Sequence, residues 1–205
     1  MEETLYKSPG GFMSMKSSDS YGSPYYYAER KGVDSIAFLL FRVGSSGGLE
    51  LGLVNESKPP LNHRLGEVVS MTTAFGGSQD EVVEEKYLKM SEEEKQELMR
   101  RIAIRECKEE AGYSIGADGV YSLGKLWLSS MMNQYVYLYA FDVNGLEVGE
   151  RNPQNTSESL SSVIWVNGVE SISCAKALSI YTKLSLVLEN KLRDNLLRVF
   201  PENLR

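Results

Sequence analysis

The chain has 205 residues, a net charge of −6, and an ordinary content of 42% hydrophobic and 24% charged residues. This length suits one domain with a sizeable core and is short for two. An acidic chain gains no general electrostatic help in binding nucleic acid or an anionic membrane, so an anionic substrate would need local cations or a metal ion. No apolar run approaches the roughly 18 residues of a membrane span, and no signal peptide is apparent. We therefore expect a cytoplasmic protein with no membrane partner.

Cysteine and histidine usage excludes several kinds of site. Cys107 and Cys174 lie far apart and have no metal-ligand partner at close spacing, which favours free, buried thiols in a reducing compartment. His63 is the only histidine, so a multi-histidine zinc site is impossible and a Ser-His-Asp triad would have to use it. Because it lies in a polar loop that contains prolines, we expect its side chain to be solvated.

The start of the chain is rich in Ser, Gly and Tyr, a composition that packs poorly on its own. We expect a mobile or partly ordered segment over 1–32, in which 25–27 could dock or form an edge strand. A single domain over 33–205 would follow.

The first part of this domain favours strands. The apolar run 34–42 predicts a buried strand, and the alternating stretch 49–54 predicts a second one that forms a hairpin with it. The stretch 70–77 is also β-prone and ends in two glycines.

A helix is predicted next. Ser91 can be its N-cap, with Glu94 as the capping-box partner, and Gly112 stands at a natural C-cap position.

The remaining elements complete the fold prediction. Strands are predicted over 119–130, 133–143 and 162–166, and an amphipathic helix over 175–199. We therefore expect an α+β fold, in which a mixed sheet lies between helices.

Three glutamates, Glu106, Glu109 and Glu110, fall within one turn of the predicted helix. Such like-charge pairs cost about 0.2–0.5 kcal/mol each. On an α-helix Glu106 and Glu110 lie about 40° apart, with Glu109 about 60° from Glu106 on the other side. Arg105, four residues before Glu109, can form a salt bridge with it. Three converging carboxylates suit a hard divalent cation, which would offset their repulsion. The bland alternative is a solvated acidic helix face.

The stretch "RECKEEAGY" resembles the Nudix box, G-x5-E-x7-R-E-U-x-E-E-x-G-U with U apolar, over its last nine positions. The residues that match are Arg105, Glu106, Cys107, Glu109, Glu110, Gly112 and Tyr113, and Glu97 stands seven residues before Arg105 as the box requires. The resemblance implies a Nudix-like α/β/α sandwich.

The start of the box departs from the pattern. Gly77 is the natural candidate for the first glycine, but nineteen residues (78–96) separate it from Glu97 where the box has five, which implies an insertion of fourteen over about 78–94. We expect a peripheral helix or lid there, a dimer contact, or an inert elaboration. On a continuous helix Glu97 would point about 180° from Glu106 but only about 80° from Arg105. We therefore assign Glu97 a supporting role beside Arg105.

The resemblance also implies a site. Glu106 and Glu110, with Glu109 assisting, would bind Mg²⁺ or Mn²⁺, and the Gly76 carbonyl would add a further oxygen ligand. Glu158 lies where the family places a loop carboxylate that joins the metal site or acts as the base, and Glu147 and Glu150 compete for this role.

The order of elements looks most like the ADP-ribose pyrophosphatase branch, although the proline that marks many of its members is missing. The implied reaction is metal-dependent hydrolysis of the pyrophosphate of ADP-ribose or an NDP-sugar. Trp127, Tyr135 and Tyr137 are candidates to stack on the base. Nucleoside triphosphates, dinucleoside polyphosphates or capped RNA remain open as substrates, as does a catalytically silent binding module. The expected partner is a small nucleotide rather than nucleic acid, and a homodimer stays open.

Overall fold

The computed structural model describes residues 2–11, 13–19, 22–30, 34–57, 63–64, 66–153 and 161–199. Its centre is a mixed sheet. Strand β4 (Ser35–Val43) runs parallel to β9 (Met132–Asp142) and antiparallel to β5 (Leu49–Ser57). Strand β10 (Ser162–Val166) pairs with β5 on the far side. The predicted hairpin and the strand predicted over 162–166 are both confirmed.

Three further strands pair with this centre. Strand β6 (Ser70–Thr73) pairs with β5, β7 (Phe75–Ser78) pairs with the start of β4, and β8 (Val120–Ser129) pairs with β9. The β7 pairing places the half-buried Gly77 opposite Ile36. Two short 3-10 turns, η3 (Ala117–Gly119) and η4 (Val169–Ser171), precede β8 and the last helix.

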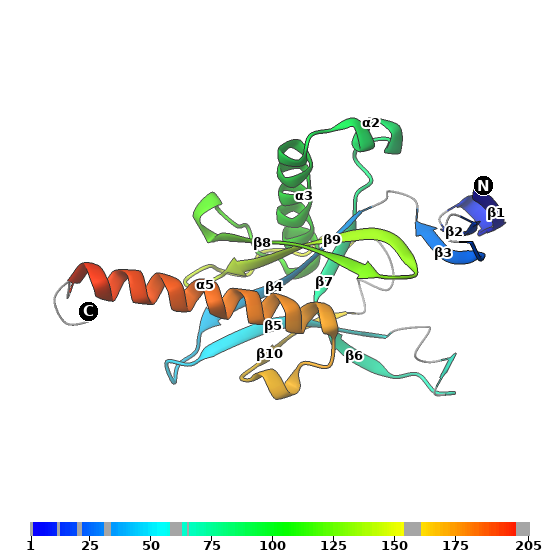
Figure 1. Cartoon of the computed structure of the whole chain (residues 1–205). Helices are drawn as coiled ribbons and strands as arrows, with labels where there is room; N and C mark the ends of the chain where they lie inside the picture. Colours follow the sequence, from blue (N-terminus) through cyan, green and yellow to red (C-terminus); the bar gives the residue numbers. More distant parts are fainter. Residues whose placement is uncertain are drawn as a thin grey trace.

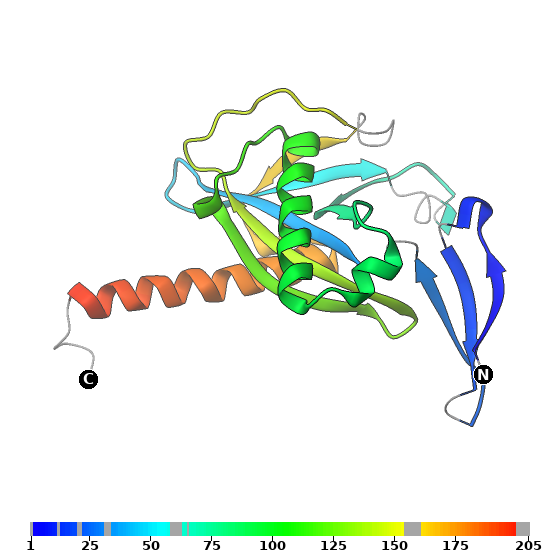
Figure 2. The same cartoon turned by 90° about the horizontal axis from the view of Figure 1, so that it is seen from above.

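Two helices cover opposite faces of the sheet, α3 (Glu92–Glu106) and α5 (Ala175–Val199), as Figures 1 and 2 show. Strand β4 is buried on both faces because its side chains alternate between two cores. Ile36, Phe38 and Leu40 pack with residues of α3, whereas Ala37, Leu39 and Phe41 pack with residues of α5. This is the predicted α/β/α sandwich.

The flanking elements follow the same alternation. Tyr137 and Tyr139 of β9 are buried on the α3 side, which makes Tyr137 a core residue rather than an exposed stacking surface. On α5, Leu184 is fully buried but Leu192 is exposed, because the C-terminal half of the helix extends beyond the sheet in both views (Figures 1 and 2). Among the helices of the described residues, none combines the length and the hydropathy of a membrane span.

The first thirty residues hold three strands that we did not predict as a set. They are β1 (Glu2–Lys7), β2 (Met13–Ser18) and β3 (Tyr25–Arg30), with a 3-10 turn, η1 (Pro9–Gly11), between the first two. Each strand pairs antiparallel with the next, and β3 joins the sheet through one bridge, Ala28 to Met132. Figures 1 and 2 show them projecting from one end of the molecule.

The expected insertion contains one short helix, α2 (Glu84–Lys89). Its Tyr87 is 1% exposed, and the phenol donates a hydrogen bond to Oδ2 of the buried Asp34 at 2.6 Å. Burial and this bond raise the pKa of Tyr87, so the phenol stays protonated and remains a donor. The other five residues of α2 are exposed, as expected of a peripheral helix, and this one buried hydrogen bond anchors the helix to the start of β4. A role for it as a lid or a dimer contact stays a prediction.

Candidate active site

The candidate site begins with a well-defined helix. The Ser91 hydroxyl accepts from the Glu94 backbone N–H at 3.2 Å, and the Glu94 carboxylate accepts from the Ser91 N–H at 2.7 Å. This is the predicted capping box, and it satisfies two of the donors that a helix start leaves unpaired.

The helix changes character where the glutamates lie. Residues Cys107–Ala111 form a π-helical turn, η2, where we predicted a continuous α-helix to Gly112. Such turns bond i to i+5 and are frequent at functional sites. The wider turn changes the angles between the glutamates from those of an ideal α-helix.

Gly112 ends this turn in the left-handed region, with φ of 80°, as its predicted C-cap role requires. A Cβ there would lie only 2.7 Å from the Gly149 carbonyl oxygen. The Gly149 N–H donates to the Gly112 carbonyl at 2.8 Å, and the Asn152 N–H donates to the Glu109 carbonyl at 2.9 Å. The loop after β9 is therefore bound directly to the end of the helix.

Two of the three glutamates are buried. Glu106 is 9% exposed and Glu110 is 8% exposed, whereas Glu109 is half-buried. Burial raises the pKa of Glu106 above its ordinary value, although its bond to Arg105 acts in the opposite direction. A carboxylate whose charge is disfavoured in this way gains from a nearby cation.

Gly77 is the residue against which Glu106 packs. A Cβ at Gly77 would lie 2.8 Å from the Cδ, Cγ and Oε1 atoms of Glu106. Glycine at this position therefore leaves the space that the Glu106 side chain occupies. Gly76 lies beside it on β7, opposite Ala37.

Arg105 connects several carboxylates. Its Nη2 donates to Glu106 Oε1 at 2.9 Å, and its Nε lies 3.7 Å from Glu109 Oε2, which is the predicted salt bridge. It also bonds to Glu81 at 2.7 Å and to Asp80 at 3.4 Å. Burial lowers the pKa of Arg105, but its bonds to Glu106 and Asp80 raise it, and the net shift is upward.

The role predicted for Glu97 needs correction. Glu97 is exposed and lies 3.7 Å from Arg100, whereas Glu81 takes the position beside Arg105. Asp80 and Glu81 were missed because helical spacing carries no information about a segment before the helix. The only signal for them was that they are acidic and follow the glycine pair.

The donor chemistry fits a hard divalent cation, because carboxylate oxygens are the ligands that Mg²⁺ and Mn²⁺ take. The space that Gly77 leaves open also fixes where the Glu106 side chain can lie. Among the described residues, however, no group of three or more Asp, Glu, His or Cys side chains is arranged to hold a metal. The predicted convergence of Glu106, Glu109 and Glu110 on one point is therefore not formed in this structure. Glu158 lies outside the described residues.

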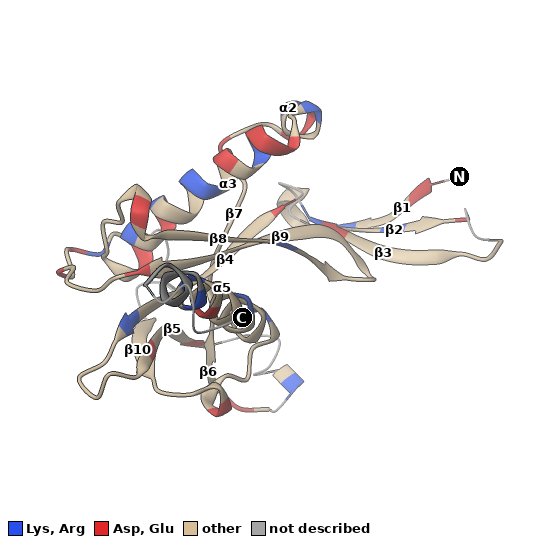
Figure 3. Ribbon diagram, turned by 60° about the vertical axis from the view of Figure 1, so that its left-hand side comes forward, with Lys and Arg blue, Asp and Glu red and all other residues tan. Residues whose placement is uncertain are grey.

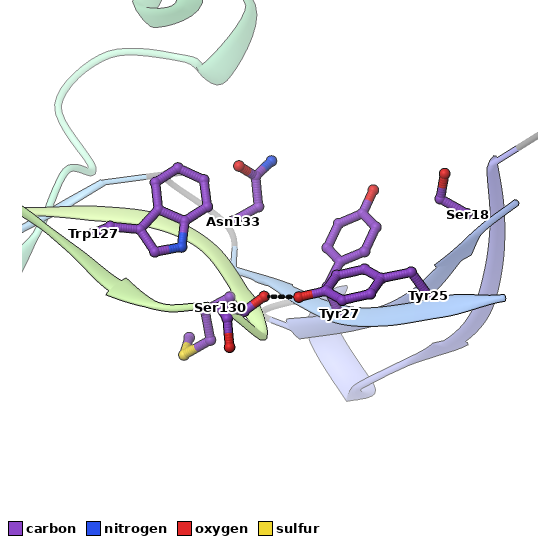
Figure 4. Close-up of a pocket in the computed structure, with 7 residues that line it drawn as sticks. Ser18, Tyr25, Tyr27, Trp127, Ser130 and Asn133 are labelled. Atoms are coloured by element: carbon purple, nitrogen blue, oxygen red, sulfur yellow. Dashed lines mark hydrogen bonds between the residues drawn. The ribbon is translucent and has the colours of Figure 1, made fainter. Parts of the chain in front are cut away.

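The predicted stacking residues occupy a second region. Trp127 of β8 is 49% exposed and meets Tyr135 of β9 edge-to-face, with ring centroids 4.9 Å apart. Trp127 lines a pocket of about 290 Å³ between the β8–β9 hairpin and the N-terminal strands, shown in Figure 4. The other lining residues are Ser18, Tyr25, Tyr27, Ser130, Met132 and Asn133. Tyr25 donates a hydrogen bond to the Ser130 carbonyl across this pocket.

Asp34 connects the two regions. One carboxylate oxygen accepts from the Tyr135 N–H at 2.9 Å, beside the aromatic pair. Its backbone carbonyl accepts from the Gln79 N–H at 3.1 Å, two residues after Gly77. A single buried residue therefore contacts both the strand of the aromatic pair and the segment that leaves the glycine pair.

The two cysteines are free as predicted, but only one of them is fully buried. Cys107 and Cys174 are both free, Cys107 buried and Cys174 half-buried, and burial raises the pKa of the Cys107 thiol. His63 is exposed. Figure 3 shows acidic and basic residues mixed along α2 and α3 rather than a continuous basic stripe.

Comparisons with known proteins give a match in structure alone. No protein-family model matches the chain, and no curated protein matches its sequence. A solved structure of an ADP compounds hydrolase superposes with a TM-score of 0.61 and 15% identity, covering 93% of each chain. An Ap4A hydrolase from C. elegans superposes with a TM-score of 0.44 and 18% identity, covering 76% of this chain and 98% of the other. The chain therefore shares the fold of the ADP compounds hydrolase, which is the α/β/α sandwich that the Nudix resemblance predicts.

Proposed function

We propose that the chain is a Nudix pyrophosphohydrolase that hydrolyses the pyrophosphate of a nucleoside diphosphate linked to another moiety, with a divalent metal ion as cofactor. ADP-ribose or an NDP-sugar is the substrate we favour. The observation that carries the proposal is a pair of buried carboxylates, Glu106 at the end of α3 and Glu110 on the π-helical turn that follows, with Glu106 packed against Gly77. The match of "RECKEEAGY" to the Nudix box and the fold shared with an ADP compounds hydrolase support it.

Mg²⁺ or Mn²⁺ would be held by Glu106 and Glu110, with Glu109 assisting and the Gly76 carbonyl as a further donor. When bound, the ion supplies Lewis-acid neutralisation of the pyrophosphate and lowers the pKa of water. Arg105 orients Glu106 and Glu109 through its bonds, so that their oxygens keep fixed directions. Bound metal also explains how a chain of net charge −6 attracts an anionic substrate.

A carboxylate on the loop after β9 would take the proton from the attacking water. Glu158 is the residue we propose for this role, and Glu147 and Glu150 are its competitors. Glu147 and Glu150 are exposed on the described part of the loop, which bonds to Gly112 and Glu109. Those bonds favour a base from this loop, because they keep the loop beside the glutamates.

Trp127 would bind the base of the nucleotide. Its half-exposed ring on the wall of a 290 Å³ pocket suits stacking, and Tyr135 supports that ring from one side. We therefore propose a small nucleotide rather than nucleic acid as the partner, in keeping with the mixed charges of Figure 3. The free thiols favour a cytoplasmic location. A homodimer stays a prediction.

A panel of nucleotides tests the proposal. The chain is incubated with Mg²⁺ and ADP-ribose, NDP-sugars, nucleoside triphosphates, dinucleoside polyphosphates or capped RNA, and with EDTA as the control. We expect ADP-ribose or an NDP-sugar to give a nucleoside monophosphate and a sugar phosphate, and EDTA to abolish the reaction. Preference for the other substrates would reassign the specificity. If the chain binds nucleotides without hydrolysing them, it is a catalytically silent binding module and not an enzyme.

A further inference from the structure

Glu81, which lies between β7 and α2, joins two arginines of α3. Its Oε1 accepts from Arg105 Nη1 at 2.7 Å, and its Oε2 accepts from Arg101 Nη2 at 2.9 Å. The Glu81 side chain is only 28% exposed. Because both oxygens have charged donors, this carboxylate is held in one orientation.

Fixing one nitrogen of Arg105 fixes the others. The guanidinium is planar and rigid, so the bond from Nη1 to Glu81 sets the directions in which Nη2 and Nε point. Those two atoms face the proposed metal ligands: Nη2 lies 2.9 Å from Glu106 Oε1, and Nε lies 3.7 Å from Glu109 Oε2. Glu81, which makes the shorter bond, and Asp80, 3.4 Å from Nη2, therefore together direct Arg105 toward each glutamate.

Glu81 also limits how strongly Arg105 competes for these oxygens. Arg101 and Arg105 are four residues apart on α3, so their charges repel each other when nothing lies between them. Without Glu81, the charge of Arg105 would be directed to Glu106, Glu109 and the more distant Asp80, whose Oδ1 lies 3.4 Å from Nη2. A guanidinium bonded more tightly to a carboxylate leaves that carboxylate a poorer ligand for a metal ion.

We propose that Glu81 is a positioning residue that holds Arg105 in the orientation that leaves Glu106 and Glu109 able to bind metal. It takes the place that the spacing of the box suggested for Glu97. This inference rests on the proposed function, because Glu106 and Glu109 belong to the proposed metal site. It also gives the segment that follows Gly77 a direct role, since Gly77 contacts Glu106 and Glu81 contacts Arg105.

The test compares Glu81→Gln with Glu97→Gln, two substitutions that each remove one negative charge near the helix. The first readout is the Kd of Mn²⁺ for the full chain without nucleotide. The second is the split between kcat and KM for the best substrate. Thermal unfolding of each variant shows whether the fold is kept.

Glu81→Gln should raise the Kd of Mn²⁺ and lower kcat, each by about 10-fold, the smaller end of the effect of residues that orient metal ligands. Its KM should stay within about twofold of wild type, because Glu81 does not touch substrate in this account. Glu97→Gln should match wild type in all three. Equal behaviour of the two variants, or a larger loss in Glu97→Gln, would overturn the inference.

A second variant separates positioning from stability. Glu81→Asp keeps the charge with a shorter reach, so it should retain more Mn²⁺ affinity than Glu81→Gln. If Glu81→Gln does not fold, Glu81→Asp becomes the test. The inference would be overturned if Glu81→Asp folds with its bond to Arg105 lengthened or broken and still binds Mn²⁺ with the Kd of the wild type. Equal losses in both folded variants would also overturn it.

The outcomes separate this inference from the proposed function. If the wild type hydrolyses nucleotides and Glu81→Gln does so equally well, the inference is wrong and the proposed function stands. Absence of hydrolysis, with Mn²⁺ bound by the wild type and weakened in Glu81→Gln, removes the function and keeps the inference. If the wild type neither hydrolyses nucleotides nor binds Mn²⁺, both are wrong.

Discussion

The end of α3 and the aromatic pocket differ in how they are built. At the end of α3, the buried Glu106 packs against a glycine of the central sheet, and a bond from Arg105 orients it. The pocket instead lies between the β8–β9 hairpin and strands that join the sheet through one bridge, Ala28 to Met132. Its main aromatic side chain, Trp127, is half exposed.

The two regions therefore suit different parts of the proposed function. Groups held by the core keep fixed positions, which suits the chemical step. Groups on peripheral strands make fewer contacts with the rest of the fold and can differ without disturbing the core, which suits recognition of one substrate among several. Substitutions at the two regions should therefore act on different kinetic constants.

The largest effect is expected at Glu110. Glu110→Gln removes a charged ligand but keeps the shape of the side chain, so kcat should fall by about 100-fold or more, exceeding the effect of residues that only orient ligands. Glu93→Gln, an exposed acid at the start of α3, is the control and should match wild type. Near-wild-type turnover of Glu110→Gln at saturating Mg²⁺ would place the chemistry elsewhere.

A smaller effect, again on kcat, is expected at Arg105, because it acts on the reaction only through the glutamates. Arg105→Lys keeps the charge but loses the planar fork that reaches several carboxylates at once, so kcat should fall by about 10-fold and KM should change less. Steady-state kinetics on the preferred substrate measure both. A large rise in KM with an unchanged kcat would mean that Arg105 binds the substrate phosphates instead.

Trp127 should show the opposite pattern. Trp127→Ala removes the proposed stacking surface, worth about 1–3 kcal/mol per base, so KM should rise about 10-fold while kcat is kept. Tyr26→Ala is the matched control, because Tyr26 is exposed on β3 and does not line the pocket. Equal kinetic constants for the two variants would mean that the pocket does not bind the nucleotide base.

The smallest effect is expected from pH. Because burial raises the pKa of Glu106, protons compete with metal there at a higher pH than at an ordinary glutamate, whose pKa is about 4.3. As the pH is lowered, the affinity for Mn²⁺ should therefore begin to fall while the pH is still above about 4.3. In Glu106→Gln, which has no carboxylate to protonate at this position, that early fall should be absent.

The sign for stability is the reverse. A folded-state pKa above the unfolded one contributes stability at low pH, and this is lost as the pH rises through the folded-state pKa. As the pH rises from the unfolded-state pKa of Glu106 through its folded-state pKa, the metal-free wild type should thus lose stability relative to Glu106→Gln. Thermal unfolding at a series of pH values measures this difference. A constant difference would mean that Glu106 has an ordinary pKa.

Features set by neighbours in the sequence could be predicted. The capping box of Ser91 and Glu94, the C-cap at Gly112 and the strand over 162–166 all depend on local patterns. Features set by contacts between distant residues could not. Nothing in the sequence indicates that Glu81 reaches across twenty-four positions to Arg105.

The N-terminal strands and the π-helical turn show the same limit. A Ser-, Gly- and Tyr-rich stretch gives no hydrophobic period, so its pairing with itself and with β9 could not be predicted. The π-turn at Cys107–Ala111 breaks the α-helical period without a glycine or proline inside it. The angles between the glutamate side chains in this structure therefore differ from those of an ideal α-helix.

The most direct test of the central claim is a crystal structure of the chain with Mn²⁺ and a non-hydrolysable ADP-ribose analogue. We expect anomalous manganese peaks at coordination distance from carboxylate oxygens of Glu106 and Glu110, between these residues and the pyrophosphate. Manganese bound only elsewhere, or a nucleotide bound with no metal at the end of α3, would contradict it.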